Sequence, residues 1–516
     1  MQAAIFHSHA IYCSADVHDG WDLQAAGAAS TRIRLPLIKR RSKLSGGHAF
    51  ALVGYNDTGF IVQNSWGEDW GAHGFALLSY EDWVANGTDA WVVGLGVPTK
   101  PTAAATTTAR RRHFVAAGSS RGTGADSRAE KKGLWSTETA YWHALVTGND
   151  GAVINCIPHL RDAADNVAFI AKEQPAAWHQ QQGTEAVLKL AVYAHGGLNS
   201  EADSIERIRY LGPAFKDNGI YPIFPTWKTC PLETIGNIVE DQLNKWFGAA
   251  AAGDAGDAKD ADARDRLIEA LTMLPGTALW QQMRENAFRS RDTGRGLDML
   301  AAQLAELNKA LAGKLEIHLV GHSAGSFLCG GLLGELRERK IGVASCTLFA
   351  PACDLDFANT TFRVAIERKH LSRDAFRIYV LSDDNERRDT VGPYKKSLLY
   401  LVSRAFDRWR KTPLLGMASS YDAAVPTGDW HHATEGHIQA WRNFFWAGKI
   451  PHGAAAVARD GAAANLSVLS DRQVSTGPQR IPSSHGCFDN SLAIVSETLR
   501  TIRGGELARK LTDLDY

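Results

Sequence analysis

A serine at a glycine-flanked turn is the strongest candidate for covalent chemistry in this sequence. Ser323 lies in the run Gly-His-Ser-Ala-Gly at 321–325. An alternating aliphatic stretch at 314–320 precedes the run and residues with helical spacing follow it, so we expect a strand, a sharp turn and a helix. The glycines allow that turn and leave the hydroxyl exposed at its tip. We therefore predict a nucleophilic serine rather than a structural serine in a glycine-rich turn.

A histidine far along the chain is predicted to be the base for this serine. His485 lies in the loop-like run 481–490, and an amphipathic helix is predicted directly after it, at 491–502. A histidine in this position can take the proton of Ser323 and return it to a leaving group. Four other histidines lie in or next to a polar segment without such a context: His431, His432, His437 and His452.

Three aspartates compete for the role of the acid that orients the histidine. They follow a strand predicted within the segment 375–389, and they are Asp383, Asp384 and Asp389. We prefer Asp383 or Asp384, because both come directly after the carboxyl end of that strand, and Asp389 is the third candidate. The aspartates that do not hold the histidine are then ordinary solvated loop charges.

A glycine-rich turn after another strand completes this group of residues. The apolar stretch within 187–200 leads into His195-Gly196-Gly197. This turn, the serine turn and the chain order of serine, aspartate and histidine resemble the α/β hydrolases, which include lipases and esterases. The resemblance implies that the backbone N–H groups of Gly197 and Ala324 form an oxyanion hole and that His195 is structural.

A histidine and an asparagine in the N-terminal part of the chain form a second candidate pair. Two strands are predicted at 49–55 and 60–66, joined by the turn Asn-Asp-Thr-Gly at 56–59. Such a hairpin places His48, at the start of one strand, opposite Asn64, near the end of the other. An amide in that position can orient an imidazole base.

The pair lies in a longer pattern that resembles the papain-like cysteine peptidases. The matching residues are Gly47, His48, Ala49, Val53, Gly54, Tyr55, Asn64, Ser65, Trp66, Gly67, Trp70, Gly71, Gly74 and Phe75. The resemblance implies that His48 is the base of a thiolate–imidazolium pair, that Asn64 orients its ring and that Trp66 shields their hydrogen bond.

The thiol that this base would activate is not in the expected place. In papain-like chains the cysteine precedes the histidine by about 130 to 150 residues, and 47 residues precede His48. Cys13 lies in an extended run and not at a helix N-terminus, which would lower the pKa of its thiol. We predict that Cys13 is a small buried strand residue. Either the natural chain is longer, or the half domain is retained for binding.

The composition is that of a globular protein without charge imbalance. The chain has 516 residues, of which 45% are hydrophobic and 22% charged, and its 56 basic and 56 acidic residues cancel. This balance gives no electrostatic reason to expect nucleic acid as a partner. No run reaches the roughly 18 to 20 apolar residues of a membrane-spanning helix. Seven cysteines without a C-x-x-C pair, and a start without a leader pattern, predict a reduced, cytoplasmic protein.

Composition also divides the chain. Residues 98–132 are rich in Ala, Thr, Gly, Ser and Arg and are predicted to be a disordered linker. The linker separates a small, mostly β papain-like half domain at 1–97 from an α/β-hydrolase-like domain at 133–516. Alternating strands and helices predict a mostly parallel sheet for the larger domain. Two other biased tracts are predicted to interrupt this domain, 249–265 as an exposed loop and 452–467 as another insertion.

We therefore predict a serine hydrolase that cleaves esters or amides through an acyl-enzyme, without a cofactor or a metal. Its substrate is a small-molecule ester or amide, or a peptide. The first alternative is cysteine peptidase activity, with His48 and Asn64 acting in a longer natural chain. The second alternative is a non-catalytic N-terminal unit that binds a partner or docks on the rest of the chain.

Overall fold

The protein is described by a computed structural model that divides the chain into two compact units, Met1–Arg110 and Arg111–Tyr516. The structure describes residues 1–2, 5, 10–23, 35–91, 133–148, 150–183, 186–196, 201–227, 258–391 and 394–515, apart from the side chains of 258–264, 271, 274 and 275. The linker predicted at 98–132 lies outside these residues. Each unit is considered by itself.

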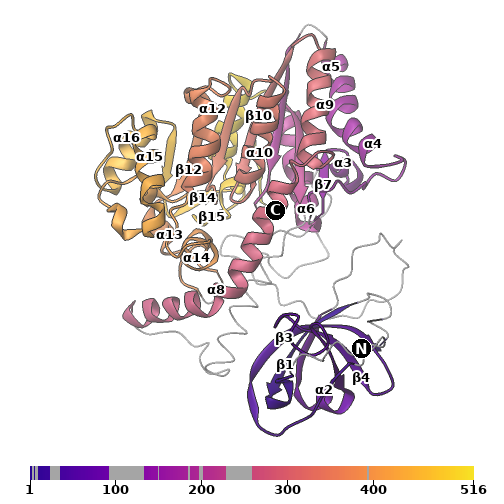
Figure 1. Cartoon of the computed structure of the whole chain (residues 1–516). Helices are drawn as coiled ribbons and strands as arrows, with labels where there is room; N and C mark the ends of the chain where they lie inside the picture. The colour runs from indigo at the N-terminus through magenta and orange to yellow at the C-terminus, as the bar shows by residue number, and fades with distance from the viewer. Residues whose placement is uncertain are drawn as a thin grey trace. The chain divides into compact units, whose positions relative to one another are not determined.

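The N-terminal unit is built on a six-stranded mixed sheet in the order β2-β5-β4-β3-β1-β6 (Figure 1). Its strands are β1 (Ile11–His18), β2 (Leu37–Ile38), β3 (Leu44–Tyr55), β4 (Gly59–Gln63), β5 (Phe75–Ser79) and β6 (Gly87–Trp91), and its helices are the 3-10 turn η1 (Asp19–Trp21) and α2 (Tyr80–Asn86). β2 pairs with β5 in parallel, and the other neighbouring strands are antiparallel. Tyr55 pairs with Phe60, which confirms the predicted hairpin.

The core of this unit lies on one face of its sheet. Every second side chain of β1 is buried, as the period of two along a strand predicts: Ile11, Cys13, Ala15 and Val17. These side chains pack with Trp21 and Phe50. The core thereby fixes β1 against β3, the strand that carries His48.

The C-terminal unit contains a seven-stranded sheet in the order β13-β12-β11-β10-β8-β9-β7, and all neighbouring pairs in it are parallel. Its strands are β7 (Ala144–Thr147), β8 (Leu188–Ala194), β9 (Tyr221–Trp227), β10 (Leu315–His322), β11 (Ser345–Phe349), β12 (Phe376–Leu381) and β13 (Leu466–Leu469). Helices lie on both faces of this sheet (Figure 1), so a central strand such as β11 is buried along its whole length. The predicted α/β class with a parallel sheet is confirmed.

The helices of the C-terminal unit connect and cover these strands. They are α3 (Thr137–Tyr141), α4 (Ala163–Ala168), α5 (Gln174–Gln182), α6 (Glu201–Lys216), α8 (Ala258–Arg289), α9 (Gly296–Ala310), α10 (Gly325–Glu338), α11 (Leu355–Ala358), α12 (Val364–Glu367), α13 (Asp383–Glu386), α14 (Leu398–Leu401), α15 (Glu435–Phe445), α16 (Ala454–Ala463) and α17 (Leu492–Arg503). Short π-helical or 3-10 segments are η2 (Phe169–Glu173), η4 (Asn359–Arg363), η5 (Arg373–Ala375), η6 (Val402–Phe406), η7 (Ala418–Tyr421), η8 (Thr427–Asp429), η9 (His432–Thr434) and η10 (Phe488–Asn490). A separate antiparallel pair consists of β14 (Gln473–Ser475) and β15 (Arg480–Pro482). The helix predicted after His485 is α17, which Ser491 caps at its N-terminus.

Two tracts predicted to be insertions contain regular structure. The tract at 249–265 enters α8, which begins at Ala258, and its residues before that point lie outside the described ones. The tract at 452–467 contains α16 and the start of β13, the edge strand of the parallel sheet. Alanine is the strongest helix former, and the described part of both tracts is helical. The exposed loop predicted at 249–265 is therefore wrong from Ala258 onward, whereas a helix in 452–467 does not contradict an insertion.

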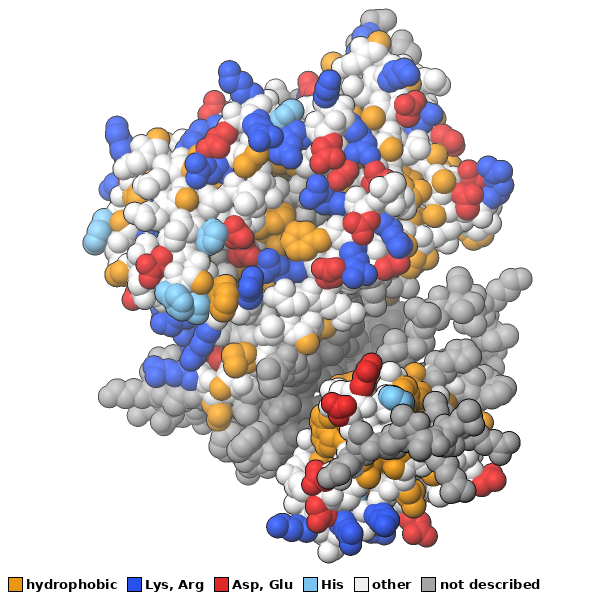
Figure 2. Space-filling model, in the orientation of Figure 1, with side chains coloured by type: hydrophobic (Ala, Val, Ile, Leu, Met, Phe, Trp, Pro, Cys, Tyr) orange, Lys and Arg blue, Asp and Glu red, His pale blue; other side chains and the backbone are white. Residues whose placement is uncertain are grey.

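The surface of the C-terminal unit carries charges of both signs. On the face drawn in Figure 2, basic and acidic side chains are interspersed among polar and apolar ones. This mixture is in keeping with the equal numbers of basic and acidic residues in the chain. Within the described ranges, no helix is both long enough and apolar enough to cross a membrane.

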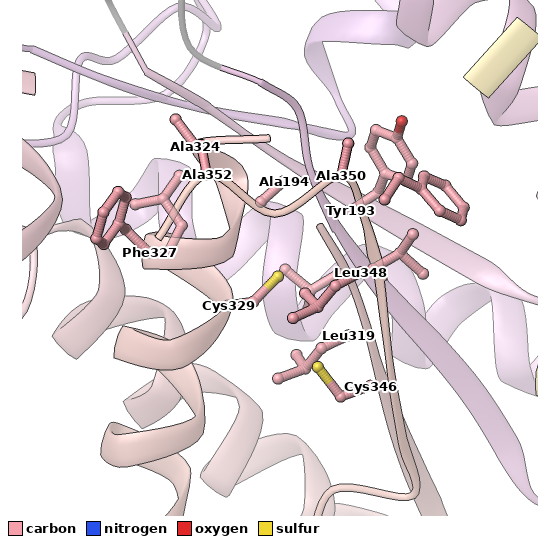
Figure 3. Close-up of a cluster of buried hydrophobic side chains, with 14 of the residues drawn as sticks. Tyr193, Ala194, Leu319, Ala324, Phe327, Cys329, Cys346, Leu348, Ala350 and Ala352 are labelled. Atoms are coloured by element: carbon pink, nitrogen blue, oxygen red, sulfur yellow. The ribbon is translucent and has the colours of Figure 1, made fainter. Parts of the chain in front are cut away.

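A buried cluster lies below the turn that carries Ser323. Figure 3 shows Ala324 at the N-terminal end of α10 and Cys329 farther along the same helix, beside the strands. Leu319 of β10 and Leu348 of β11 belong to this cluster, and all four of these side chains are buried. Close packing of this kind resists displacement, so the cluster sets the position of the turn between β10 and α10.

Candidate functional site

Ser323 occupies the turn between β10 and α10, as the sequence predicts. Its backbone is left-handed, with a φ of 54°, which is uncommon for a residue other than glycine and has to be held by the surrounding structure. The Ser323 N–H donates to the carbonyl of Phe349 on β11 at 2.8 Å, and the Ser323 carbonyl accepts from the Ser326 hydroxyl at 2.7 Å. The neighbouring strand and the first turn of α10 therefore hold this conformation.

Two glycines of the serine turn are required by close packing. A Cβ on Gly325 would lie 2.1 Å from a backbone carbonyl oxygen of β8, and a Cβ on Gly321 would lie 2.8 Å from Cys329 Sγ. Side chains do not come this close, so glycine lets α10 pack on the strands next to it. Gly196 also lies close to the nucleophile, where a Cβ would be 3.2 Å from Ser323 Cβ.

The structure brings Ser323 and His485 into contact. The distance between Ser323 Oγ and His485 Nε2 is 2.8 Å, and both side chains are buried. With the hydroxyl as donor, Nε2 is the acceptor and the ring proton lies on Nδ1. A serine nucleophile needs this contact with a base. Nδ1, the ring nitrogen that an acid would bind, is buried and makes no hydrogen bond among the described residues.

Asp389 is the predicted aspartate that contacts His485. Its Oδ2 accepts the backbone N–H of His485 at 2.7 Å, and its Oδ1 accepts the backbone N–H of Thr390 at 2.8 Å. These bonds fix the backbone of the loop that carries the base, and neither goes to the imidazole ring. The role of Asp389 as the acid therefore stays a prediction. Its contact with the His485 backbone favours it over Asp383 and Asp384.

The structure does not bring Asp383 or Asp384 to His485. Both aspartates lie on α13, and their carboxylates bond to neighbouring side chains: Arg387 and Tyr400 for Asp383, and Arg388 and Arg472 for Asp384. Each carboxylate is therefore neutralised by arginine. Our preference for the two aspartates nearest to the strand end is corrected, because the chain first turns into α13 and reaches the His485 loop only at Asp389.

Burial shifts the pKa values of the two groups in opposite directions. Burial first, and the His322 ring second, lower the pKa of His485 to about 3, and Asp489 partly opposes this shift. Burial raises the pKa of Asp389 to about 6, against the two backbone hydrogen bonds that it accepts. Near neutral pH, His485 is therefore uncharged and able to accept a proton, while Asp389 carries its negative charge.

The predicted oxyanion hole lies partly within the described residues. Ala324 precedes α10 as its N-terminal cap, and the partial positive charge at a helix N-terminus stabilises an anion. Gly197 lies outside the described residues. His195 is buried, with Nδ1 2.6 Å from the Gly196 carbonyl oxygen and Nε2 3.1 Å from Ser204 Oγ.

Sequence reasoning missed two residues beside the serine and its base. His322 Nε2 lies 2.9 Å from the carbonyl oxygen of His485, and His322 Nδ1 lies 3.4 Å from Asp489 Oδ2. His322 is the variable residue before the serine in the G-x-S-x-G run, and Asp489 follows the base on the same loop. Neither position is specified by the motif, so only the packing shows that they meet.

In the N-terminal unit, His48 and Asn64 form a hydrogen-bonded pair across the hairpin. The distance between His48 Nε2 and Asn64 Oδ1 is 2.7 Å. An amide oxygen only accepts, so Nε2 donates and Nδ1 is the ring atom that can take a proton. The centroids of the Trp66 and His48 rings lie 4.4 Å apart, so the tryptophan covers one side of the pair.

Cys13 is not placed as a nucleophile for this pair. It lies within β1, its side chain is fully buried, and its Sγ faces the Ile11 carbonyl oxygen at 3.9 Å. Burial first, and Asp89 second, raise the pKa of its thiol to about 12, whereas a nucleophilic thiol needs a lowered pKa. The predicted buried strand residue is confirmed.

The structure thus shows two candidate sites, a histidine with an asparagine in one unit and a serine with a histidine in the other. Comparison with known families bears on the first of them. Residues 1–89 match the family model of the papain family cysteine proteases. This range contains His48 and Asn64, so the papain-like resemblance of the N-terminal part is supported. None of the curated proteins matches the chain.

Proposed function

We propose that the C-terminal unit hydrolyses esters or amides through an acyl-enzyme on Ser323. The observation that carries this proposal is the 2.8 Å contact between Ser323 Oγ and His485 Nε2, at a left-handed turn between a parallel strand and a helix. The all-parallel sheet with helices on both faces supports the resemblance to α/β hydrolases. A fold shared by many functions would not carry the proposal without this contact.

The proposed reaction begins with proton transfer from Ser323 Oγ to His485 Nε2. The oxygen attacks the carbonyl carbon of the substrate, and the negative charge that forms on the carbonyl oxygen is stabilised by the N–H of Ala324. His485 then gives the proton to the leaving alcohol or amine, and the acyl-enzyme remains. Water repeats the sequence with His485 as base, which releases the carboxylic acid and restores the hydroxyl of Ser323.

In this proposal Asp389 stabilises the imidazolium that forms on His485. Its carboxylate already accepts the backbone N–H of His485, it is charged near neutral pH because its pKa is about 6, and His485 Nδ1 lacks a partner among the described residues. A buried N–H without a partner is costly, so a carboxylate that reaches Nδ1 would stabilise the ring.

The experiment that tests the serine hydrolase is active-site labelling. A fluorophosphonate probe should modify the full chain once, and peptide mass spectrometry should place the modification on Ser323. The Ser323→Ala variant should not react. Ser290→Ala is the control, because Ser290 is also a buried serine of this unit and its hydroxyl bonds to the Ala287 carbonyl. Equal labelling of wild type and Ser323→Ala would refute the proposal.

We propose a second function for the N-terminal unit, the base and orienting amide of a papain-like cysteine peptidase. The family match at 1–89 favours it, so the comparisons support this function better than they support the serine hydrolase. In this proposal His48 Nδ1 takes the proton of a thiol, and Asn64 holds the ring through Nε2. The thiol would come from a segment other than β1, because Cys13 is buried with a raised pKa.

Two steps test the peptidase. The coding DNA before Met1, translated in frame, should reveal a cysteine at a helix start if the natural chain is longer. That longer chain should then cleave peptides and react with an epoxysuccinyl inhibitor, and both activities should be lost in His48→Ala. A longer chain that reacts equally well with His48 replaced would refute this role. The cytoplasmic location and the substrate classes named above stay predictions.

A further inference from the structure

A second histidine–aspartate pair lies directly behind the base. His322 Nε2 is 2.9 Å from the carbonyl oxygen of His485, and the centroids of the two rings are 5.4 Å apart. On its other side, His322 Nδ1 lies 3.4 Å from Asp489 Oδ2. His322 thus touches the loop of the base at one nitrogen and a carboxylate at the other.

The contact with His485 fixes one proton on His322. A carbonyl oxygen only accepts, so Nε2 must carry a hydrogen and donate. Nδ1 faces the carboxylate of Asp489 at 3.4 Å and makes no hydrogen bond among the described residues. The ring therefore lies between the backbone of the base and a buried carboxylate.

Asp489 is itself held from several elements. It is fully buried, and its Oδ2 accepts the hydroxyl of Tyr193 on β8 at 3.0 Å and lies 3.2 Å from Arg207 Nη1 on α6. Burial alone would raise the pKa of Asp489, but Arg207 and then His322 outweigh it, so the pKa lies below its ordinary value. The carboxylate is therefore charged, and it forms a fixed point between the strand, the helix and the His485 loop.

We propose that His322 and Asp489 are positioning residues for the base: Asp489 holds the His322 ring, and His322 holds the backbone of His485 so that Nε2 stays on Ser323. The inference rests on the proposed serine hydrolase function of this unit. Asp389 holds the backbone N–H of the same residue, so the peptide groups on both sides of His485 are bonded to buried side chains.

Loss of this hold should affect the chemical step more than substrate binding. Neither His322 nor Asp489 is needed to take up the proton of Ser323. A displacement of the base by about 1 Å can lower a rate by about a hundredfold. We therefore expect a lower kcat with little change in KM.

The experiment compares His322→Leu, which removes the donor, with His322→Gln, which retains a side-chain N–H. In His322→Leu we expect kcat and the rate of fluorophosphonate labelling to fall by about tenfold to a hundredfold, with KM within about twofold of the wild-type value. His322→Gln should recover most of the loss. Asp489→Asn should resemble His322→Leu, because the ring is then no longer held by a charge.

The matched control is His318→Leu. His318 lies on the same strand β10 and is equally buried. Like His322, it has an oxygen partner and a carboxylate as neighbours, here Ser345 Oγ at 2.8 Å and Glu316 Oε2 at 3.7 Å. Its replacement should lower the melting temperature and leave kcat of the folded protein near the wild-type value. If His318→Leu and His322→Leu lower kcat equally, the role is merely structural and the proposal is wrong.

Two other outcomes would also overturn it: wild-type kcat in His322→Leu, or a His322→Gln variant as slow as His322→Leu. If His322→Leu does not fold, a wild-type kcat in Asp489→Asn overturns it.

If the wild-type chain neither turns over ester substrates nor labels on Ser323, the hydrolase proposal fails. The positioning of His485 is then measured by its ring ¹⁵N–¹H resonances in histidine-labelled full chain, and a spectrum unchanged in His322→Gln and Asp489→Asn would refute it.

Discussion

The two units bring a histidine to its partner in different ways. In the N-terminal unit, His48 and Asn64 are 16 positions apart and face each other across one antiparallel hairpin. In the C-terminal unit, Ser323 and His485 are 162 positions apart and meet after a whole parallel sheet has been assembled. The first pair can be recognised from a short motif and from a family match. The second pair depends on the packing of the entire unit.

The units also differ in what each histidine lacks. His48 has its orienting amide. Cys13, the one cysteine among the described strands of its sheet, is fully buried and cannot serve as its nucleophile. His485 has its serine, but its Nδ1 has no partner in the described part of the chain. A base without a nucleophile has no covalent step to assist, whereas a nucleophile and base without the acid retain part of their activity. The two proposals therefore differ in what each still needs, a thiol for His48 and an acid for His485.

The largest effect should come from replacing the serine or its base. Ser323→Ala and His485→Ala should each lower ester hydrolysis by about four to six orders of magnitude, because nucleophile and base act as a unit. His48→Ala, the matched change in the other unit, should leave this rate unchanged. The measurement is kcat/KM on a chromogenic ester. A large loss of ester hydrolysis in His48→Ala would show that the two sites do not act independently.

The acid should have the next largest effect. Asp389→Asn should lower kcat/KM by about two to four orders of magnitude, because the imidazolium loses its counter-charge. Asp383→Asn and Asp384→Asn should each stay within about threefold of the wild-type rate, because their carboxylates bond to Arg387 and Arg388, which follow α13. A large loss in either of these two variants, with Asp389→Asn active, would restore our first assignment.

The pH dependence should report the same aspartate. Burial raises the pKa of Asp389 to about 6, and the charged form is needed, so the labelling rate of Ser323 should rise with pH through about 6 and then level off. The stability effect has the opposite sign. The pKa of Asp389 is higher in the folded than in the unfolded protein, so its protonated form stabilises the fold. This stabilisation is complete at pH values below the pKa of the unfolded chain and is lost as the pH rises through about 6. Persistence of the same inflection in Asp389→Asn would assign it to another group.

The smallest expected effect is the absence of reaction at Cys13. An epoxysuccinyl inhibitor of cysteine peptidases should not alkylate this thiol in the folded chain, because it is fully buried and its pKa is raised to about 12. Intact mass before and after treatment gives the measurement, with Cys13→Ser as the control. Stoichiometric alkylation that disappears in Cys13→Ser would make Cys13 the missing nucleophile.

Motifs and periodicity predicted the local parts of both sites. The strand, turn and helix around Ser323, the hairpin of His48 and Asn64, and α17 after His485 all follow from spacing over a few residues. The choice among the three aspartates did not follow from spacing. It depends on where the chain goes after β12, and the short helix α13 turns the first two toward Arg387 and Arg472.

The pair formed by His322 and Asp489 could not be predicted from the sequence either, because it also depends on how distant segments pack. Nothing in the composition of the 481–490 loop distinguishes Asp489 from a solvated charge. Its role depends on Tyr193 and Arg207 from other elements, and such contacts are long-range consequences of the sheet order. Similarly, alanine bias alone did not predict that the tract at 452–467 contains the helix α16.

The parallel sheet also affects the order in which the protein folds. Strand β10 pairs directly with β8 although their side chains Lys189 and Glu316 are 127 positions apart. Closing so long a segment carries a larger entropy loss than closing a hairpin, which forms in about 1 to 10 µs. The β3–β4 hairpin should therefore form early in refolding, whereas the contact between Ser323 and His485 should form among the last features, well after most of the helical circular dichroism signal.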